Sequence, residues 1–229
     1  MLILGLTKTT LLDYPGKVAA TVFTGGCNFR CPFCHNGQLV LNVANEPQVS
    51  EDEVFEHLRK RKNILEGVCI TGGEPTIQAD LTEFIAKIKD MGYAIKLDTN
   101  GTNPSKMKEL IDNKLIDYVA MDVKNSKEKY YRTSKCSELM LEKVEESISL
   151  LLSGCIEYEF RTTVVKPLHS KEDLEEIACR LAGASAWYIQ SYKESDNIIG
   201  EGMSAYSKAE LQKMIEGIKN VPCSIRGID

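Results

Sequence analysis

Residues 24–37 read TGGCNFRCPFCHNG and place three cysteines, Cys27, Cys31 and Cys34, within eight residues. The spacing is C-x3-C-x2-C, and the apolar run Val18–Thr24 comes directly before it. Three thiols in one short loop are too crowded for disulfides between them. A metal ion or a metal cluster is therefore the economical interpretation of this loop.

Two kinds of metal centre compete for these cysteines. A zinc site takes four Cys or His ligands and usually pairs two C-x2-C hooks on separate turns. His35 makes a poor fourth zinc ligand because it follows Cys34 directly, and side chains of neighbours in an extended loop diverge. An iron–sulfur cluster is held by cysteine thiolates, normally four, so three would leave one iron open for a substrate or cofactor. The ligand set favours the open cluster, with zinc as the alternative.

The composition is that of an ordinary globular protein. The 229 residues suit one domain, 1–229, with a short N-terminal extension over residues 1–16. A net charge of −5 argues against an extended nucleic-acid surface. No apolar run is long enough to predict a membrane helix, and the start Met1–Gly5 lacks the basic region of a signal peptide.

Five further cysteines are scattered along the chain without a pairing pattern. We expect them to be reduced and mostly buried thiols, which predicts a reducing, cytoplasmic location. They are Cys69, Cys136, Cys155, Cys179 and Cys223.

Strand and helix patterns alternate along the chain. Turn chemistry at Asp13-Tyr14-Pro15-Gly16 precedes the first repeat, and Asp80 is expected to cap the second helix. Alternation of this kind predicts parallel strands joined by right-handed crossovers. Six units are fewer than a closed barrel needs, so the predicted fold class is α/β, an incomplete open-sided (β/α)6 barrel. We expect strands at 18–24, 68–71, 93–97, 118–121, 156–165 and 186–190, helices at 50–62, 80–92, 137–152 and 170–183 and from 103 and 207, and loops at 38–49 and 125–136.

Chemically versatile residues follow the first four of these strands. In parallel barrels the chemistry lies at the carboxyl ends of the strands, so the sequence predicts one site at that end. The residues in question are the three cysteines after the first strand, Gly72-Gly73-Glu74 after the second, Asp98-Thr99 after the third, and Asp122 with Lys124 after the fourth.

Two motifs together resemble a known superfamily. The cysteine loop, with the aromatic Phe33 before its last cysteine, resembles the signature of the radical S-adenosylmethionine (SAM) enzymes. The segment Thr71–Pro75 resembles the GGEP turn of the same enzymes. Four further segments are similar to the activases of glycyl radical enzymes: Asp13–Gly16, Cys34–Asn36, Asp98–Gly101 and Asp122–Lys124.

The resemblance implies a role for each residue of the expected site. The three cysteines would hold a 4Fe–4S cluster whose open iron chelates SAM. Gly72 and Gly73 would let backbone groups approach the methionine ammonium, and Glu74 would balance its charge, the alternative being a solvated side chain. Asp98 would bind a ribose hydroxyl and Lys124 a carboxylate. The implied cofactor-binding residues are Phe33, His35, Gly72, Gly73, Glu74, Asp98, Thr99, Lys124 and Arg161.

Two details of the resemblance concern single positions. Asp98, Thr99 and Asp122 match positions that surround a monovalent cation in some activases, and oxygen ligands suit a hard cation. Activases of the pyruvate formate-lyase type carry a His after the sixth strand that contacts SAM, whereas residues 190–193 here read QSYK. Either Tyr192 or Lys193 substitutes for it, or SAM is bound differently.

The implied function is reductive cleavage of SAM and installation of a glycyl radical on a partner enzyme. The leader Leu11–Lys17 is most similar to the activating protein of anaerobic ribonucleoside-triphosphate reductase, which makes that reductase the expected partner and reduced flavodoxin or ferredoxin the expected electron donor. We expect no nucleic-acid or membrane partner. The residues expected to receive the partner's loop are Asp13, Lys127, Lys129 and Arg132.

Four alternatives stay open at this point. The first is a radical SAM enzyme that acts on a small molecule through the same site. The second is an activase of the pyruvate formate-lyase type. The third is a non-catalytic iron–sulfur protein, which would need no Gly-Gly-Glu-Pro turn. The fourth is a zinc-stabilised binding module.

Overall fold

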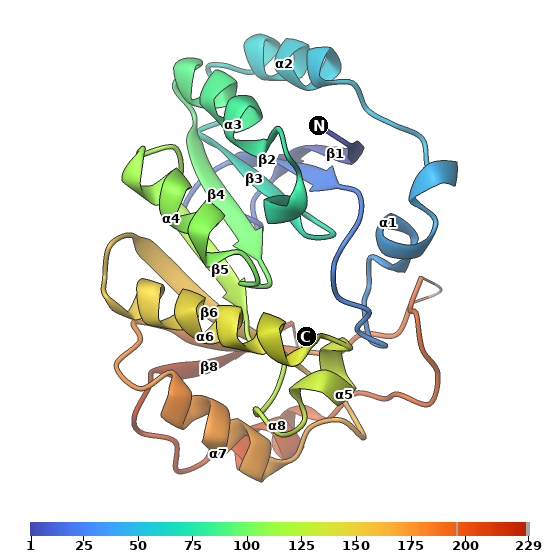
Figure 1. Ribbon diagram of the computed structural model, residues 1–229, viewed down its shortest axis with the longest axis vertical. Helices are drawn as coiled ribbons and strands as arrows, with labels where there is room; N and C mark the ends of the chain where they lie inside the picture. The colour runs from blue at the N-terminus through green and yellow to red at the C-terminus, as the bar shows by residue number, and fades with distance from the viewer. Residues whose placement is uncertain (196, 228–229) are drawn as a thin grey trace. The chain divides into compact units, whose positions relative to one another are not determined.

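The computed structural model describes residues 1–195 and 197–227 and confirms the alternation of strands and helices (Figure 1). The described residues form one eight-stranded sheet whose strands follow in chain order, with β1 and β8 at its two edges. The strands are β1 (Ile3–Thr10), β2 (Ala19–Thr24), β3 (Gly67–Gly72), β4 (Ala94–Thr99), β5 (Tyr118–Asp122), β6 (Glu157–Val164), β7 (Trp187–Ser191) and β8 (Cys223–Arg226). The sheet is open, so the predicted incomplete α/β barrel is confirmed.

The predicted helices are also present. They are α2 (Glu51–Lys60), α3 (Leu81–Asp90), α4 (Pro104–Asp112), α6 (Glu138–Leu152), α7 (Lys171–Arg180) and α8 (Lys208–Ile215). Two short helices occupy segments that were expected to be loops, namely α1 (Gly37–Leu41) and α5 (Tyr130–Ser134). Both have only five residues, too few for a periodic pattern to stand out in the sequence. No helix of the described residues is both long and apolar enough to cross a membrane.

The chain forms two compact units. Unit one comprises Met1–Asn28, Gln38–Thr99 and Ser105–Val119, and unit two comprises Phe29–Gly37, Asn100–Pro104 and Ala120–Asp229. Unit one holds β1 to β4, unit two holds β6 to β8, and β5 belongs to both. The single domain predicted for residues 1–229 stays a prediction.

In unit one, β1 pairs antiparallel with β2, and β2, β3 and β4 pair in parallel. The Ser50 hydroxyl accepts from the amide of Glu53 at 3.1 Å and caps α2, as its sequence predicts. The predicted cap on α3 is wrong, because the Asp80 side chain makes no capping bond and pairs with the N-terminal ammonium instead. The large apolar residues of α3 are all buried: Leu81, Phe84, Ile85 and Ile88.

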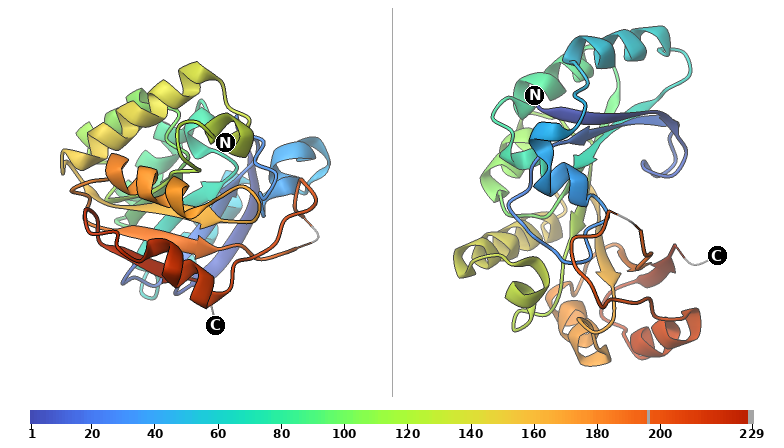
Figure 2. Two further views of the ribbon diagram at one scale, coloured as in Figure 1. Left: turned by 90° about the horizontal axis from the view of Figure 1, so that it is seen from below. Right: turned by 90° about the vertical axis from the view of Figure 1, so that its right-hand side faces the viewer.

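In unit two, β6, β7 and β8 pair in parallel. Ser137 and Ser207 cap α6 and α8 through bonds to Met140 and Glu210, and α7 and α8 lie side by side below the strands in Figure 1 and in the right-hand view of Figure 2. β8 was not predicted from the sequence; its four residues follow Pro222 and include the polar residues Ser224 and Arg226. A strand this short and mixed has no clear alternation to detect.

Candidate active site

The cysteines of the loop are free thiols, which a cluster site requires. None of the eight cysteines, all of which lie in the described residues, is part of a disulfide. Cys31 is buried and Cys27 and Cys34 are half-buried, and the amide of Cys34 donates to the carbonyl of Cys31 at 3.1 Å, which closes a tight turn. Burial raises the pKa of the Cys34 thiol, so the thiolate needs the compensating positive charge that a bound metal supplies.

Three thiols in this setting suit the chemistry of an iron–sulfur cluster. Within the described part of the chain, no three His, Cys, Asp or Glu side chains lie close enough to hold one metal ion together. Each thiolate of a four-iron cluster binds a different iron, so this spacing is no obstacle to the cluster. Of the other five cysteines, two are buried (Cys69 and Cys136), Cys223 is half-buried, and Cys155 and Cys179 are exposed. The expectation that these five are mostly buried is therefore wrong.

The Gly-Gly-Glu turn after β3 is bonded to the chain just before Cys27. The amide of Gly73 donates to the carbonyl of Thr24 at 2.9 Å, and the amide of Glu74 donates to that of Gly26 at 2.8 Å. These bonds carry the β2–β3 pairing beyond the strand ends. A Cβ atom on Gly73 would lie 1.8 Å from the Gly26 oxygen, so only glycine permits this approach.

Glu74 is buried rather than solvated. Its Oε1 atom accepts from the Thr76 amide at 3.1 Å and from the Thr99 hydroxyl at 2.8 Å. The alternative of a solvated side chain is therefore wrong. Since a buried carboxylate needs such donors, Glu74 and Thr99 form one polar cluster at the ends of β3 and β4.

Asp98 has a partner, Lys96, that was not singled out in the sequence. Its carboxylate pairs with the ammonium of Lys96, which is buried on the same strand. The thiol of Cys69 lies 3.7 Å from both the Lys96 Nζ and the Asp98 Oδ1 atoms. Strand alternation could have revealed this pair, because residues two apart on a strand share one face.

In unit two, Asp122 lies between two cations. Its carboxylate is 3.0 Å from Lys124 Nζ and 3.0 Å from Arg161 Nε. Burial alone would raise the pKa of Asp122, but the positive charges of Arg161 and Lys124 lower it to about 2. Burial would lower the pKa of Lys124, yet the carboxylate of Asp122 and the nearby Cys31 keep it raised. Lys124 is thus a permanent cation close to the cysteine turn.

The predicted cation ligands have protein partners. Asp98 is paired with Lys96, Asp122 with Lys124 and Arg161, and the Thr99 hydroxyl donates to Glu74. The proposed monovalent cation site stays a prediction, and it would have to share these carboxylates with the protein's own cations.

His169 joins Lys124 to the cysteine loop in unit two. Its Nε2 atom lies 2.8 Å from the carbonyl oxygen of Lys124, and its ring meets that of Phe33 edge-on at 6.2 Å between centroids. Burial lowers the pKa of His169, so the neutral ring is the stable form. The sequence analysis missed this residue because it follows β6 in a segment with no motif.

A second aromatic pair involves the region where the family's His is absent. The ring of Tyr192, which is buried, lies 5.8 Å from that of His35, centroid to centroid. Further along the chain, the amide of Gly200 donates to the carbonyl of Pro32 at 2.7 Å. Residues after β7 therefore contact the cysteine loop through Tyr192 and Gly200.

The residues predicted to receive a partner are mostly engaged within the chain. The Lys127 ammonium is 2.9 Å from Glu145, and that of Lys129 is 2.6 Å from Asp173. Arg132 is exposed.

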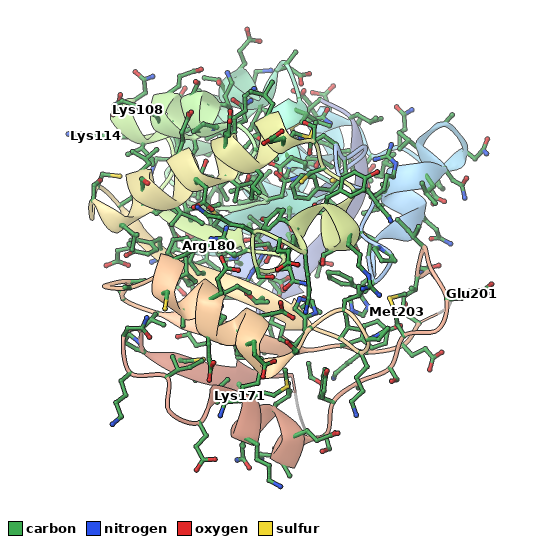
Figure 3. All side chains as sticks on the ribbon, turned by 60° about the horizontal axis from the view of Figure 1, so that its bottom comes forward. Lys108, Lys114, Lys171, Arg180, Glu201 and Met203 are labelled. Carbon is green, nitrogen blue, oxygen red and sulfur yellow. The ribbon has the colours of Figure 1, made fainter. Side chains whose placement is uncertain are left out.

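Two more contacts hold the segments around these residues. The Asp13 carboxylate accepts from the Thr21 hydroxyl. Segment 125–136 is held in place from α7, where Arg180, labelled in Figure 3, donates to the carbonyl of Asn125 at 2.8 Å.

The comparisons with known proteins identify the superfamily of the chain. The family described as the radical SAM superfamily matches residues 21–180. A Methanocaldococcus jannaschii protein named as a glycyl-radical enzyme activating enzyme is 37% identical over 199 residues, covering 85% of this chain and 81% of that protein. A second protein of that organism with the same kind of name is 29% identical, covering 90% of this chain and 80% of its own length.

Among solved structures, SuiB of Streptococcus suis matches with a TM-score of 0.68 and 16% identity. The match covers 89% of this chain and 47% of SuiB, so the chain spans less than half of that protein. At this identity the likeness concerns the fold alone. The family match over residues 21–180 and the 37% identity show that the chain belongs to the radical SAM superfamily, and its cofactors are a 4Fe–4S cluster and S-adenosylmethionine.

Proposed function

We propose that this radical SAM enzyme activates anaerobic ribonucleoside-triphosphate reductase by installing a glycyl radical. The observation that carries the activase role is the 37% identity to a protein named for that role, over 81% of that protein's length. The choice of reductase rests on the leader Leu11–Lys17. Reduced flavodoxin or ferredoxin is the proposed electron donor.

The chemistry comes from the cofactors. The cluster would supply the electron for reductive cleavage of bound SAM, and the cleaved SAM would supply the radical chemistry that removes a hydrogen atom from a glycine Cα of the partner. The protein's task is to bind, orient and exclude water. Cys27, Cys31 and Cys34 are the proposed cluster ligands.

The proposed SAM contacts divide by charge. The amides of Gly73 and Glu74 donate to the backbone before Cys27, which fixes the turn in place. We propose that its backbone carbonyl groups approach the SAM ammonium, because an ammonium is a donor and needs acceptors. Lys124 is the cation proposed to bind the SAM carboxylate, and Arg161 is a second cation proposed to contact SAM. Both already balance Asp122, which holds their side chains in place before SAM binds.

The first experiment is anaerobic reconstitution with iron and sulfide, followed by reduction with SAM and measurement of 5′-deoxyadenosine. Cys31→Ala should abolish the product. Cys136→Ala is the matched control, because Cys136 is also buried and lies outside the loop, and it should keep the activity. Absence of 5′-deoxyadenosine from wild-type protein that holds a reducible four-iron cluster would refute SAM cleavage.

The partner is tested separately. The reduced enzyme is mixed with SAM and either anaerobic ribonucleoside-triphosphate reductase or pyruvate formate-lyase, and the glycyl radical is measured by electron paramagnetic resonance. The proposal expects a signal with the reductase. A signal with the lyase alone would show that pyruvate formate-lyase is the partner. Formation of 5′-deoxyadenosine that is stimulated only by a metabolite would favour a small-molecule substrate.

A further inference from the structure

Lys96 is a lysine inside the protein. It lies in the middle of β4, and only 2% of it is exposed. Its neighbours Ile95 and Leu97 are buried on the opposite face of the strand. Lysine is almost never fully buried unless its charge is paired, so the reason for this position lies in its partners.

Those partners are two groups on the same face of the sheet. The Lys96 ammonium pairs with Asp98 Oδ1, two residues along the strand. Cys69 is the register partner of Lys96 on β3, and its sulfur lies 3.7 Å from the ammonium and 3.7 Å from the same carboxylate oxygen. The Asp98 side chain is thus bounded by a cation and by a thiol.

This arrangement contributes more to placing a carboxylate than to stability. A buried ion pair is weak evidence for stabilisation, since apolar residues of similar volume are often as good or better. A pair at the carboxyl end of a parallel strand lies where such folds bind their ligands. An ionised carboxylate held in one rotamer is an acceptor only, which suits two neighbouring hydroxyl donors.

We propose that Lys96 is a positioning residue that holds the Asp98 carboxylate in place to accept hydrogen bonds from the ribose hydroxyls of SAM. The inference rests on the proposed function and on the contact between Asp98 and a ribose hydroxyl that the resemblance to radical SAM enzymes implies. Lys96 itself does not touch SAM. Its effect on SAM binding therefore depends entirely on the presence of the Asp98 carboxylate.

That dependence is measurable in a double-mutant cycle. The variants are Lys96→Met, Asp98→Asn and the two combined, each reconstituted with its cluster, and the measurement is the Kd for SAM. Lys96→Met should weaken binding about tenfold in the wild-type background and less than twofold in the Asp98→Asn background. Lys108→Met is the control. Lys108 also pairs with an aspartate, Asp112, four residues along the chain, but both side chains are about 60% exposed, and Lys108 is labelled at the surface in Figure 3.

A second readout separates positioning from general damage. Wild-type protein should bind the 2′-deoxy and 3′-deoxy analogues of SAM more weakly than SAM, and Lys96→Met should lose most of that discrimination. Thermal unfolding is recorded for every variant. If Lys96→Met does not fold, Lys96→Leu, which also removes the donor beside Asp98, takes its place in the cycle.

Three results would overturn the inference: equal weakening by Lys96→Met in both backgrounds, unchanged SAM binding, or undiminished discrimination against the deoxy analogues. Failure of the proposed function is a different result, namely wild-type protein that holds a cluster and forms no 5′-deoxyadenosine. The two failures are therefore distinguishable.

Discussion

The amide of Gly73 donates to the carbonyl of Thr24 at 2.9 Å, three residues before the first cysteine of the loop. Gly73→Ala would place a Cβ atom 1.8 Å from the Gly26 oxygen, so the backbone of one of the two segments would have to shift. We expect about 1–3 kcal/mol of destabilisation and a loss of most of the bound iron after reconstitution, because Cys27 moves with Gly26.

Gly5→Ala is the control for that experiment. A Cβ atom there would make ordinary contact with Phe23 at 3.4 Å, so iron content should match wild type. Normal iron and sulfide content in Gly73→Ala would show that this approach of the two loops does not position the cysteine.

The lowered pKa of Asp122 leads us to expect that the free energy of unfolding depends on pH. Its pKa in the folded protein is lowered from 3.8 to about 2, so its carboxylate contributes stability that is present above pH 4 and is lost as the pH falls towards 2. The difference amounts to about 2 kcal/mol. In chemical denaturation of the protein without cluster, Asp122→Asn should be less stable than wild type at pH 6, and the gap should close on acidification.

Asp112→Asn removes an exposed carboxylate that is paired with Lys108 and should show a small, nearly constant gap over the same pH range. A gap for Asp122→Asn that stayed constant down to pH 2 would mean that the carboxylate is not held ionised by Lys124 and Arg161.

The sequence predicted the fold and the residue types of the site because both depend on local patterns. Alternating strands and helices gave the open barrel, and the cysteine spacing with the Gly-Gly-Glu turn gave the superfamily. Strand alternation places Lys96 and Asp98 on one face of β4, but it does not show that the lysine is buried there. His169 lies in a segment with no motif, and a lone His in a sequence carries no sign of its contact with Lys124.

Ion pairs that form only in the folded chain explain why the cap predicted at Asp80 is wrong. Asp80 has the residue type of a helix cap, but the N-terminal ammonium competes for its carboxylate. The expectation that Lys127 and Lys129 belong to a docking loop stays a prediction, and each also pairs with an acidic residue in unit two. Charge patterns in a sequence do not reveal which charges neutralise each other inside the fold.

Those pairs leave Arg132 as the sharpest test of partner docking. It is exposed on α5, and Arg132→Glu should lower the rate of glycyl radical formation on the reductase about tenfold while 5′-deoxyadenosine formation without the partner stays at the wild-type level. Lys143→Glu is the control, since Lys143 is an exposed basic residue of α6 in the same unit. Equal rates for Arg132→Glu and wild type would remove this loop from the docking surface.

We expect the ring of Tyr192 to protect the bound cluster from chelators. Its ring packs against that of His35, the residue after Cys34, at 5.8 Å between centroids. Tyr192→Ala removes this aromatic contact and the apolar area buried with it, so the end of the cysteine loop gains freedom and chelators reach the cluster sooner. Tyr192→Phe keeps the ring and is the matched control. We expect bleaching of the cluster's visible absorbance by a chelator to be several-fold faster in Tyr192→Ala and near the wild-type rate in Tyr192→Phe. If the phenylalanine variant bleaches as fast as the alanine variant, the hydroxyl rather than the ring contact protects the cluster, and Tyr192 then acts through a hydrogen bond, as a substitute for the histidine would.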